Sequence, residues 1–181
     1  MAKKPKIAIV GRPNVGKSTL FNKLSGKRAS IVDQMEGVTR DRVYSSAEWL
    51  SQEFNIIDTG GYVSSNEDIF NEKIKVQISA AIEECDGIIF LVDGKDGLNP
   101  NDQFLSKIIR KSGKKFVVGV NKCDTPEHDI RKDQFFDMGF ENPIPISALN
   151  GAGVGDMLDN LFELIDFLSL IHISEPTRRT I

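Results

Sequence analysis

The stretch GRPNVGKS occupies residues 11–18, where it follows the apolar run of residues 6–10 and opens an expected helix over residues 18–25. A strand, a glycine-containing loop and a helix in this order form the context that a phosphate-binding P-loop requires. Gly11 and Gly16 permit the tight turn and the close approach of backbone N–H groups to a phosphate, and the helix N-terminus adds a favourable dipole. The candidate nucleotide-binding residues of this loop are Gly11, Arg12, Pro13, Asn14, Val15, Gly16, Lys17, Ser18 and Thr19.

Lys17 and Ser18 give the loop its chemical specificity. The ammonium of Lys17 is expected to reach the β- and γ-phosphates of a nucleotide, and the hydroxyl of Ser18 is expected to bind Mg²⁺. A glycine-rich turn between a strand and a helix is common, but a Lys-Ser pair in this register is rare by chance. The loop alone does not select the base, because ATPases and small-molecule kinases use the same cradle.

Short apolar runs alternate with segments of helical spacing along most of the chain. We expect strands over residues 6–10, 44–50, 54–57, 87–92, 115–120 and 143–146, with residues 44–50 as an antiparallel edge strand. We expect helices over residues 18–25, 66–84, 101–111 and 154–167. This alternation predicts an α/β protein with a mostly parallel six-stranded sheet and helices on both faces.

The length and the chain end indicate one domain followed by a tail. A chain of 181 residues, 40% of them hydrophobic, suits a single globular domain, which we place at residues 1–168. From Leu168 the sequence reads LSLIHISEPTRRTI, with no period that continues the preceding helix. We expect residues 169–181 to be a vector-derived or disordered tail, and an interdomain linker is the alternative.

The charge balance predicts no strong overall attraction to polyanions, and the cysteine content favours a cytoplasmic protein. The 23 Lys and Arg residues against 26 Asp and Glu residues leave a net charge of −3, so no strong overall field attracts nucleic acid. Cys85 and Cys123 form no CxxC pair and no metal cluster, which favours reduced thiols. No signal peptide and no apolar run near 18 residues is present, so we expect no membrane association.

Two later motifs choose a base. Asn121-Lys122-Cys123-Asp124 follows an expected strand, so its side chains lie at the strand's C-terminal end, where ligands collect in such sheets. A carboxylate at Asp124 can accept hydrogen bonds from N1–H and the 2-amino group of guanine, which adenine does not offer. Ser147, Ala148 and Leu149 follow another apolar segment and can bring backbone N–H groups to the guanine O6, although an ordinary turn would explain them as well.

The stretch DTGG at residues 58–61 supplies a second part of a phosphate site. Asp58 ends an expected strand and is predicted to hold Mg²⁺ through a water molecule. Gly61 can bring its backbone N–H to the γ-phosphate, and loss of that phosphate would release the loop. Tyr62 stands where many GTP-hydrolysing enzymes keep a water-orienting glutamine. Since a phenol cannot orient the water as an amide does, Tyr62 is expected to be a loop aromatic turned away from the nucleotide.

With these motifs in this order, the chain resembles the translation-factor-related GTPases of the TrmE-Era-EngA group. The stretches at residues 58–61, 37–41 and 30–32 are most similar to the first GTPase domain of the Der (EngA) family. That family carries two GTPase domains and a KH-like domain and assists assembly of the large ribosomal subunit. The resemblance therefore implies an isolated first domain that binds GTP and GDP, with the second G domain and the KH-like domain absent. Contacts with the ribosome large subunit and rRNA are implied by the resemblance alone.

The resemblance also implies roles for two loop residues. Thr39 is carried over as a ligand of Mg²⁺ and of the γ-phosphate. In K⁺-activated relatives an asparagine at the position of Asn14 helps to coordinate a monovalent cation beside the phosphates, which implies K⁺ as an activator. A turn residue that tolerates an unusual backbone angle is the alternative for Asn14. The predicted catalytic residues are Lys17, Asn14, Thr39 and Gly61, and Arg40 and Arg42 receive no catalytic role.

The sequence thus predicts a Mg²⁺-dependent GTP hydrolase that acts as a GDP/GTP switch. A guanine-nucleotide-sensing module with negligible hydrolysis as an isolated fragment is the main alternative. A small-molecule phosphotransferase ranks third, since no second substrate pocket is suggested.

Overall fold

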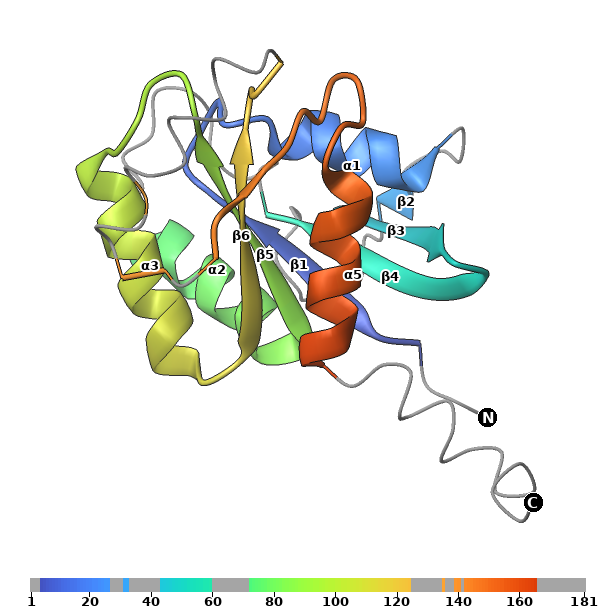
Figure 1. Ribbon diagram of the computed structural model, residues 1–181. Coiled ribbons are helices and arrows are strands. Elements are labelled where there is room, and N and C mark those ends of the chain that lie inside the picture. The colour runs from blue at the N-terminus through green and yellow to red at the C-terminus, as the bar shows by residue number, and fades with distance from the viewer. Residues whose placement is uncertain are drawn as a thin grey trace, which may run out of the picture.

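The computed structural model describes residues 4–26, 31–32, 43–59, 72–124, 135, 139–140 and 142–165 of the chain. These residues form one seven-stranded sheet in the order β2-β3-β4-β1-β5-β6-β7, with helices packed on it (Figure 1). The strands are β1 Lys6–Val10, β2 Ile31–Val32, β3 Val43–Trp49, β4 Gln52–Asp58, β5 Gly87–Asp93, β6 Lys115–Asn121 and β7 Ile144–Pro145. The helices are α1 Lys17–Ser25, α2 Glu72–Glu84, α3 Pro100–Ser112 and α5 Val154–Leu164.

The sheet confirms the predicted α/β fold. Strands β4, β1, β5, β6 and β7 are parallel, and β3 pairs antiparallel with β4. All six predicted strands are present, but the two-residue strand β2 pairs antiparallel with β3 and takes the edge that we assigned to β3. Leu50 lies outside β3, because Leu50 and Ser51 have φ angles of 52° and 65° and form the two-residue hairpin turn into β4.

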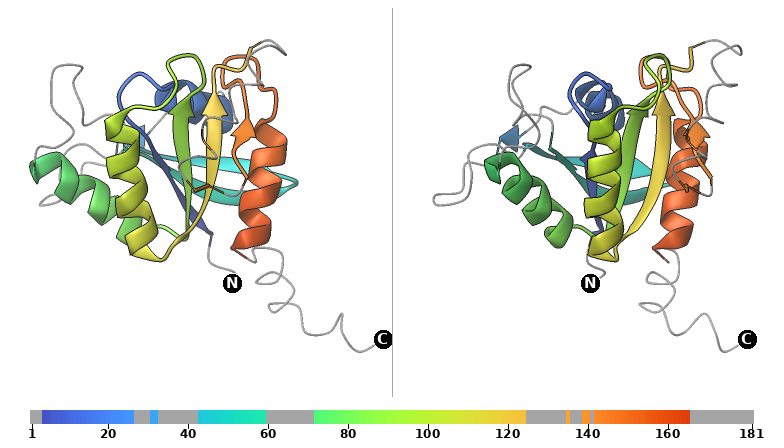
Figure 2. Two further views of the ribbon diagram at one scale, coloured as in Figure 1. Left: turned by 60° about the vertical axis from the view of Figure 1, so that its left-hand side comes forward. Right: turned by 90° about the vertical axis from the view of Figure 1, so that its left-hand side faces the viewer.

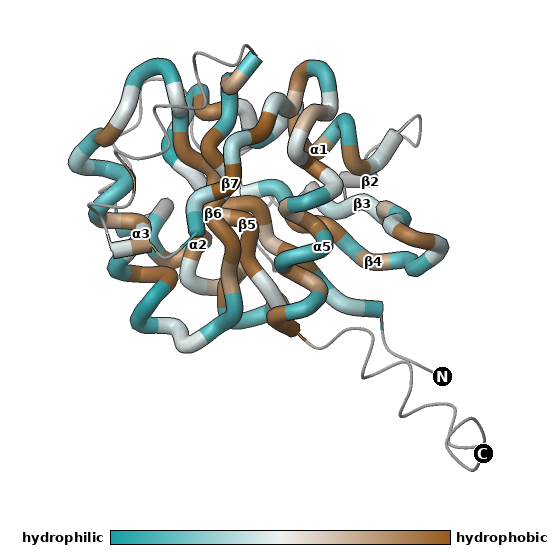
Figure 3. Tube along the Cα trace, viewed as in Figure 1, coloured by the Kyte–Doolittle hydropathy of each residue, from teal (hydrophilic) through white to brown (hydrophobic). Residues whose placement is uncertain are grey.

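The helices cover both faces of the sheet, as predicted. Side chains alternate along β1, so that Ile7 and Ile9 join the core under α1 and α5 while Ala8 and Val10 join the core under α2 and α3. Figure 2 shows α5 on one side of the strands and α2 and α3 on the other. Apolar residues concentrate along the central strands and polar ones on the outside (Figure 3). The fold therefore has three layers with the sheet in the middle.

Two helix boundaries and the chain end are only partly described. Helix α2 begins at Glu72, and residues 66–71 of the predicted helix lie outside the described residues. Helix α5 ends at Leu164, and the predicted tail at 169–181 is not described. Within the described part of the chain, no helix is both long and apolar enough to cross a membrane.

The parallel strands place polar residues at one edge of the sheet. Asp58 ends β4, Asp93 ends β5 and Asn121 ends β6, and Asp93 pairs in register with Asn121. The P-loop leaves β1 at this same edge (Figure 1). Ligands of open α/β sheets collect outside the carboxyl ends of strands, so this edge is the candidate functional site.

Candidate nucleotide site

The two glycines of the P-loop are required by the backbone. Gly11 follows β1, and a Cβ there would lie 2.6 Å from the carbonyl oxygen of Leu91. Gly16 has a φ of 105°, and its Cβ would lie 2.2 Å from Nδ2 of Asn121. Substituting either residue would displace the loop, because the Cβ of the first would collide with β5 and that of the second with the side chain of Asn121.

The other residues of the loop divide into a buried and an exposed set. Val15 is fully buried in the core beneath the loop, whereas Asn14, Ser18 and Thr19 are exposed and Pro13 is half-buried. Asn14 has a φ of 68°, a left-handed conformation that asparagine adopts more readily than most residues. The turn role considered for Asn14 is therefore present in the structure, and it is compatible with a further role for the exposed side chain.

Lys17 is folded back over the loop. Its Nζ donates hydrogen bonds to the carbonyl oxygens of Gly11, at 2.5 Å, and Arg12, at 2.7 Å, and the residue is only 5% exposed. Burial lowers the pKa of the Lys17 ammonium from 10.5 to about 8, although the nearby carboxylate of Asp58 raises it. A buried cation of this kind is stabilised by an anionic ligand, which the phosphates of a nucleotide would supply.

Ser18 and Asp58 form the candidate metal site. The Ser18 hydroxyl lies 3.5 Å from Oδ2 of Asp58, a carboxylate that is 4% exposed. Thr59 fixes the end of β4, because its hydroxyl donates to the carbonyl oxygen of Ile9 at 2.7 Å. A hydroxyl and a carboxylate are hard oxygen donors, the type that Mg²⁺ prefers. Thr39 and Gly61 lie outside the described residues, and their roles remain predictions.

Asn121 joins the P-loop to the loops that are predicted to bind the base. Its Nδ2 donates to the carbonyl oxygen of Val15 at 2.8 Å, and its Oδ1 accepts from the N–H of Ala148 at 2.8 Å. The residue is 4% exposed. One buried amide therefore fixes the position of the P-loop relative to the turn at residues 147–149.

The predicted guanine motifs lie side by side. The Ser147 hydroxyl donates to Oδ1 of Asp124 at 2.6 Å, and the Cys123 N–H donates to the carbonyl oxygen of Ile146 at 3.0 Å. Ala148 is buried, whereas Leu149 is 77% exposed. The two segments predicted to recognise the base thus meet at one place, and Ser147 orients the carboxylate of Asp124.

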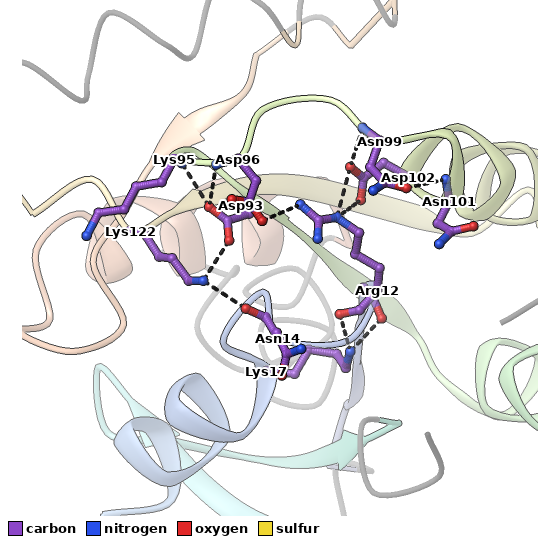
Figure 4. A network of polar contacts seen from close by, with 11 residues as sticks. Arg12, Asn14, Lys17, Asp93, Lys95, Asp96, Asn99, Asn101, Asp102 and Lys122 are labelled. Carbon is purple, nitrogen blue, oxygen red and sulfur yellow. Dashed lines mark hydrogen bonds and ion pairs between the residues drawn. The ribbon is translucent and has the colours of Figure 1, made fainter. Parts of the chain in front are cut away.

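Lys122, a residue of the predicted base motif, contacts the P-loop at Asn14. Its Nζ donates to the carbonyl oxygen of Asn14 at 2.8 Å and to Oδ2 of Asp93 at 2.6 Å (Figure 4). Burial raises the pKa of Asp93, but hydrogen bonds from Lys122 and from the N–H groups of Asp96 and Lys95 outweigh it, so the pKa lies below its ordinary value. Asp93 was not among the predicted site residues, since its only signal in the sequence is a carboxylate between an apolar strand and a glycine.

Arg12 extends toward α3 (Figure 4). Its guanidinium is almost fully buried, with Nε 3.3 Å from Asp102 and Nη2 3.5 Å from Asp96. Asp102 also closes the capping box of α3, since its Oδ2 accepts from the N–H of Asn99 at 3.1 Å. Burial raises the pKa of Asp102 above its ordinary value, although Arg12 opposes this shift. The side chain of Arg12 therefore anchors the loop to α3, a role that the sequence did not suggest.

Two GTPase relatives match most of this chain. The chain is 54% identical over 156 residues to GTPase Der of Macrococcus caseolyticus and 52% identical over 160 residues to GTPase Der of Clostridium novyi. These matches cover 86% and 88% of this chain and 36% of each relative. The chain therefore spans about a third of the length of these relatives.

Solved structures support the same relationship. An Era variant from Aquifex aeolicus bound to GDP and AlF₄⁻ matches with a TM-score of 0.70 and 28% identity, over 90% of this chain and 57% of that one. Era in complex with MgGDPNP and a segment of 16S ribosomal RNA matches with the same TM-score and identity, over 91% and 57% of the two chains. The sequence pattern of one family, described as the 50S ribosome-binding GTPase family, matches residues 6–122. Since that match spans well over half of the sequence, the chain belongs to the 50S ribosome-binding GTPase family.

Proposed function

We propose that this chain is a guanine-nucleotide-binding G domain that hydrolyses GTP to GDP and phosphate and acts as a GDP/GTP switch. The observation that carries the proposal is the Asn121 amide, which joins a P-loop to a motif and a turn suited to guanine. Asp124, oriented by Ser147, supplies the acceptor for the two guanine donors. Competition of GDP and ADP for the site tests the base choice, and equal affinities would refute it.

The residues at the sheet edge divide the chemistry of phosphate binding among them. The backbone N–H groups of the P-loop bind phosphate oxygens, and the buried ammonium of Lys17 turns from its two carbonyl partners to the phosphates. Ser18 and Asp58 would hold Mg²⁺, with Thr39 as a third ligand carried over from the resemblance. When bound, Mg²⁺ supplies positive charge against the phosphate oxygens.

We further propose K⁺ as an activator held in part by Asn14. The exposed Asn14 side chain offers an uncharged oxygen, and its own backbone carbonyl is occupied by Lys122. Replacing Na⁺ by K⁺ at constant ionic strength is expected to speed hydrolysis roughly tenfold, about 1.4 kcal/mol in barrier. Asn14→Gly is the sharpest variant, because glycine accepts the φ of 68° and removes the oxygen, whereas Asn14→Ala also strains the turn.

The outcomes of this experiment separate the candidate functions. The proposal is supported if both Asn14 variants lose the K⁺ response while Asn14→Gly keeps nearly the full affinity for GDP. The Tyr62→Ala variant should lose much less of its rate of hydrolysis. Equal rates in Na⁺ and K⁺ would refute the activator role. A multiple-turnover assay without phosphate release in either salt would favour the alternative, a nucleotide-sensing module with negligible hydrolysis.

The remaining proposals concern the domain bounds, the location and the partners. Residues 1–168 would form the G domain, residues 169–181 a tail, and the cytoplasm the location. Large ribosomal subunits and rRNA would be partners of a full-length protein of the Der type, which carries further domains. Co-sedimentation with 50S subunits tests this, and we expect this chain alone to bind far more weakly than a full-length relative.

A further inference from the structure

A groove lies between α2 and α3, outside the nucleotide site. Its volume is about 560 Å³, and none of its lining residues belongs to the P-loop or to the base-binding loops. Its floor contains the apolar residues Ile82, Phe104 and Ile108. Its rim carries the lysines Lys75, Lys107, Lys111 and Lys114. Figure 2 shows α2 and α3 side by side on the face opposite α5.

The charge of this groove is opposite to that of the whole chain. Among the described residues, four lysines line it against one acidic residue, Glu83, whereas the chain has a net charge of −3. Two of the lysines are held in place. Lys114 Nζ donates to the carbonyl oxygens of Glu83 and Cys85 at 3.3 and 2.9 Å, and Lys75 Nζ lies 5.4 Å from the ring centroid of Phe104. Lys107 and Lys111 are exposed one helical turn apart on α3.

An apolar floor between two helices, with a cationic rim, is complementary to an amphipathic helix that carries acidic residues. Aliphatic side chains spaced three and four residues apart would enter the floor, and carboxylates beside them would meet the lysines. RNA fits less well. The ring of Phe104 already contacts Lys75, Ile82 and Ile108 are aliphatic, and among the described lining residues no arginine is present to stack on a base.

We propose that the α2–α3 groove is a docking site for an acidic amphipathic helix of a partner protein. The described lining of the groove contains no residue of the proposed nucleotide site, so docking there does not require GTP hydrolysis. Charge attraction would make the contact weaken with salt, and the aliphatic floor would give it sequence dependence.

The test uses a synthetic 14-residue helical peptide with leucine or isoleucine at helical spacing and glutamate at the flanking positions. It is titrated into ¹⁵N-labelled, GDP-bound protein, and amide shifts are followed by NMR. We expect shifts concentrated in α2 and α3, and binding at least tenfold weaker for Lys111→Glu. Lys115→Glu is the matched control, because it makes the same charge change at an exposed position outside this groove, and it should change affinity less than twofold.

A further variant and an RNA probe distinguish a helical peptide from RNA as the ligand of the groove. Ile108→Gln should also weaken peptide binding about tenfold, and unchanged GDP affinity in all variants shows that they fold. A peptide that shifts no α2 or α3 amide would overturn the proposal. So would an oligouridine that shifts the same amides at lower concentration than the peptide, or equal losses in Lys111→Glu and Lys115→Glu.

Discussion

Asp102→Asn tests the anchor between the P-loop and α3. The substitution keeps the shape of the side chain, and an amide oxygen can still accept from the N–H of Asn99. It removes the charge that faces Arg12, a residue that is only 8% exposed. Among the described residues, Asp96 is then the only carboxylate that forms an ion pair with Arg12. It lies 3.5 Å from Nη2, and its side chain is 68% exposed.

The size of the effect follows from two opposed contributions. Removing one partner of a buried ion pair costs about 3–5 kcal/mol, because the other charge stays buried without compensation. Part of this cost is recovered. Burial disfavours the charged carboxylate of Asp102, as its raised pKa indicates, and the neutral amide of asparagine avoids that cost of burying a charge. We therefore expect the free energy of unfolding to fall by about 2–3 kcal/mol. In a chain of this length that lowers the melting temperature by roughly 5–10 °C.

Urea denaturation of the nucleotide-free protein measures this loss. Asp96→Asn is the matched control, because it removes an exposed carboxylate from the same guanidinium and should cost less than about 0.5 kcal/mol. The double variant Arg12→Met, Asp102→Asn should recover at least about half of the loss, since no buried charge remains. An Asp102→Asn protein as stable as the parent, or a double variant less stable than the single one, would refute the anchor.

Three other predictions follow from the base motif, the tail and Asp93. Asp124→Asn should weaken GDP binding by roughly 3 kcal/mol, about two orders of magnitude, and admit xanthine nucleotides; unchanged GDP affinity in a calorimetric titration would remove the base-recognition role. Deleting the residues after Leu168 should leave the melting temperature and GDP affinity unchanged, and a loss of several degrees would show that the tail packs on the domain. Since the pKa of Asp93 is lowered from 3.8 in the folded state, its carboxylate stabilises the fold above that value and loses this effect as pH falls through the lowered pKa. The stability advantage of the parent over Asp93→Asn should therefore be constant from pH 7 to about pH 5 and shrink below about pH 4, and an advantage that grows with acid would contradict this assignment.

The sequence was sufficient for the sheet and for placing together those predicted site residues that the structure describes, whose roles in nucleotide binding stay predictions. Buried parallel strands are uninterrupted apolar runs, and each motif directly follows one of them. Predicting a strand therefore also predicts where the side chains of the motif after it lie. The strand β2 was missed because its two residues are too short for any period to appear. Leu50 was assigned to a strand because its apolar side chain resembles one, whereas its backbone forms the turn.

The supporting contacts of the site could not be predicted. Arg12 and Asp102 are 90 positions apart, and Asp93 and Lys122 are 29 positions apart, so only the folded sheet brings each pair together. A buried ion pair leaves no periodic trace in a sequence, because a single charged residue on a helix such as α3 resembles any solvated one.

The bridge made by Asn121 has a consequence for the exchange of one nucleotide for another. Its amide bonds the P-loop at Val15 and the turn at Ala148, and the next residue of that turn, Leu149, projects into solvent. A protein that bound Leu149 and displaced the turn outward would break the hydrogen bond between Ala148 and Asn121. The hydrogen bond from Asn121 to the P-loop would then be weakened as well. If the nucleotide binds as proposed, GDP would then lose contacts at the guanine and at the phosphates together, and a partner that binds the exposed side chain of Leu149 would accelerate its release.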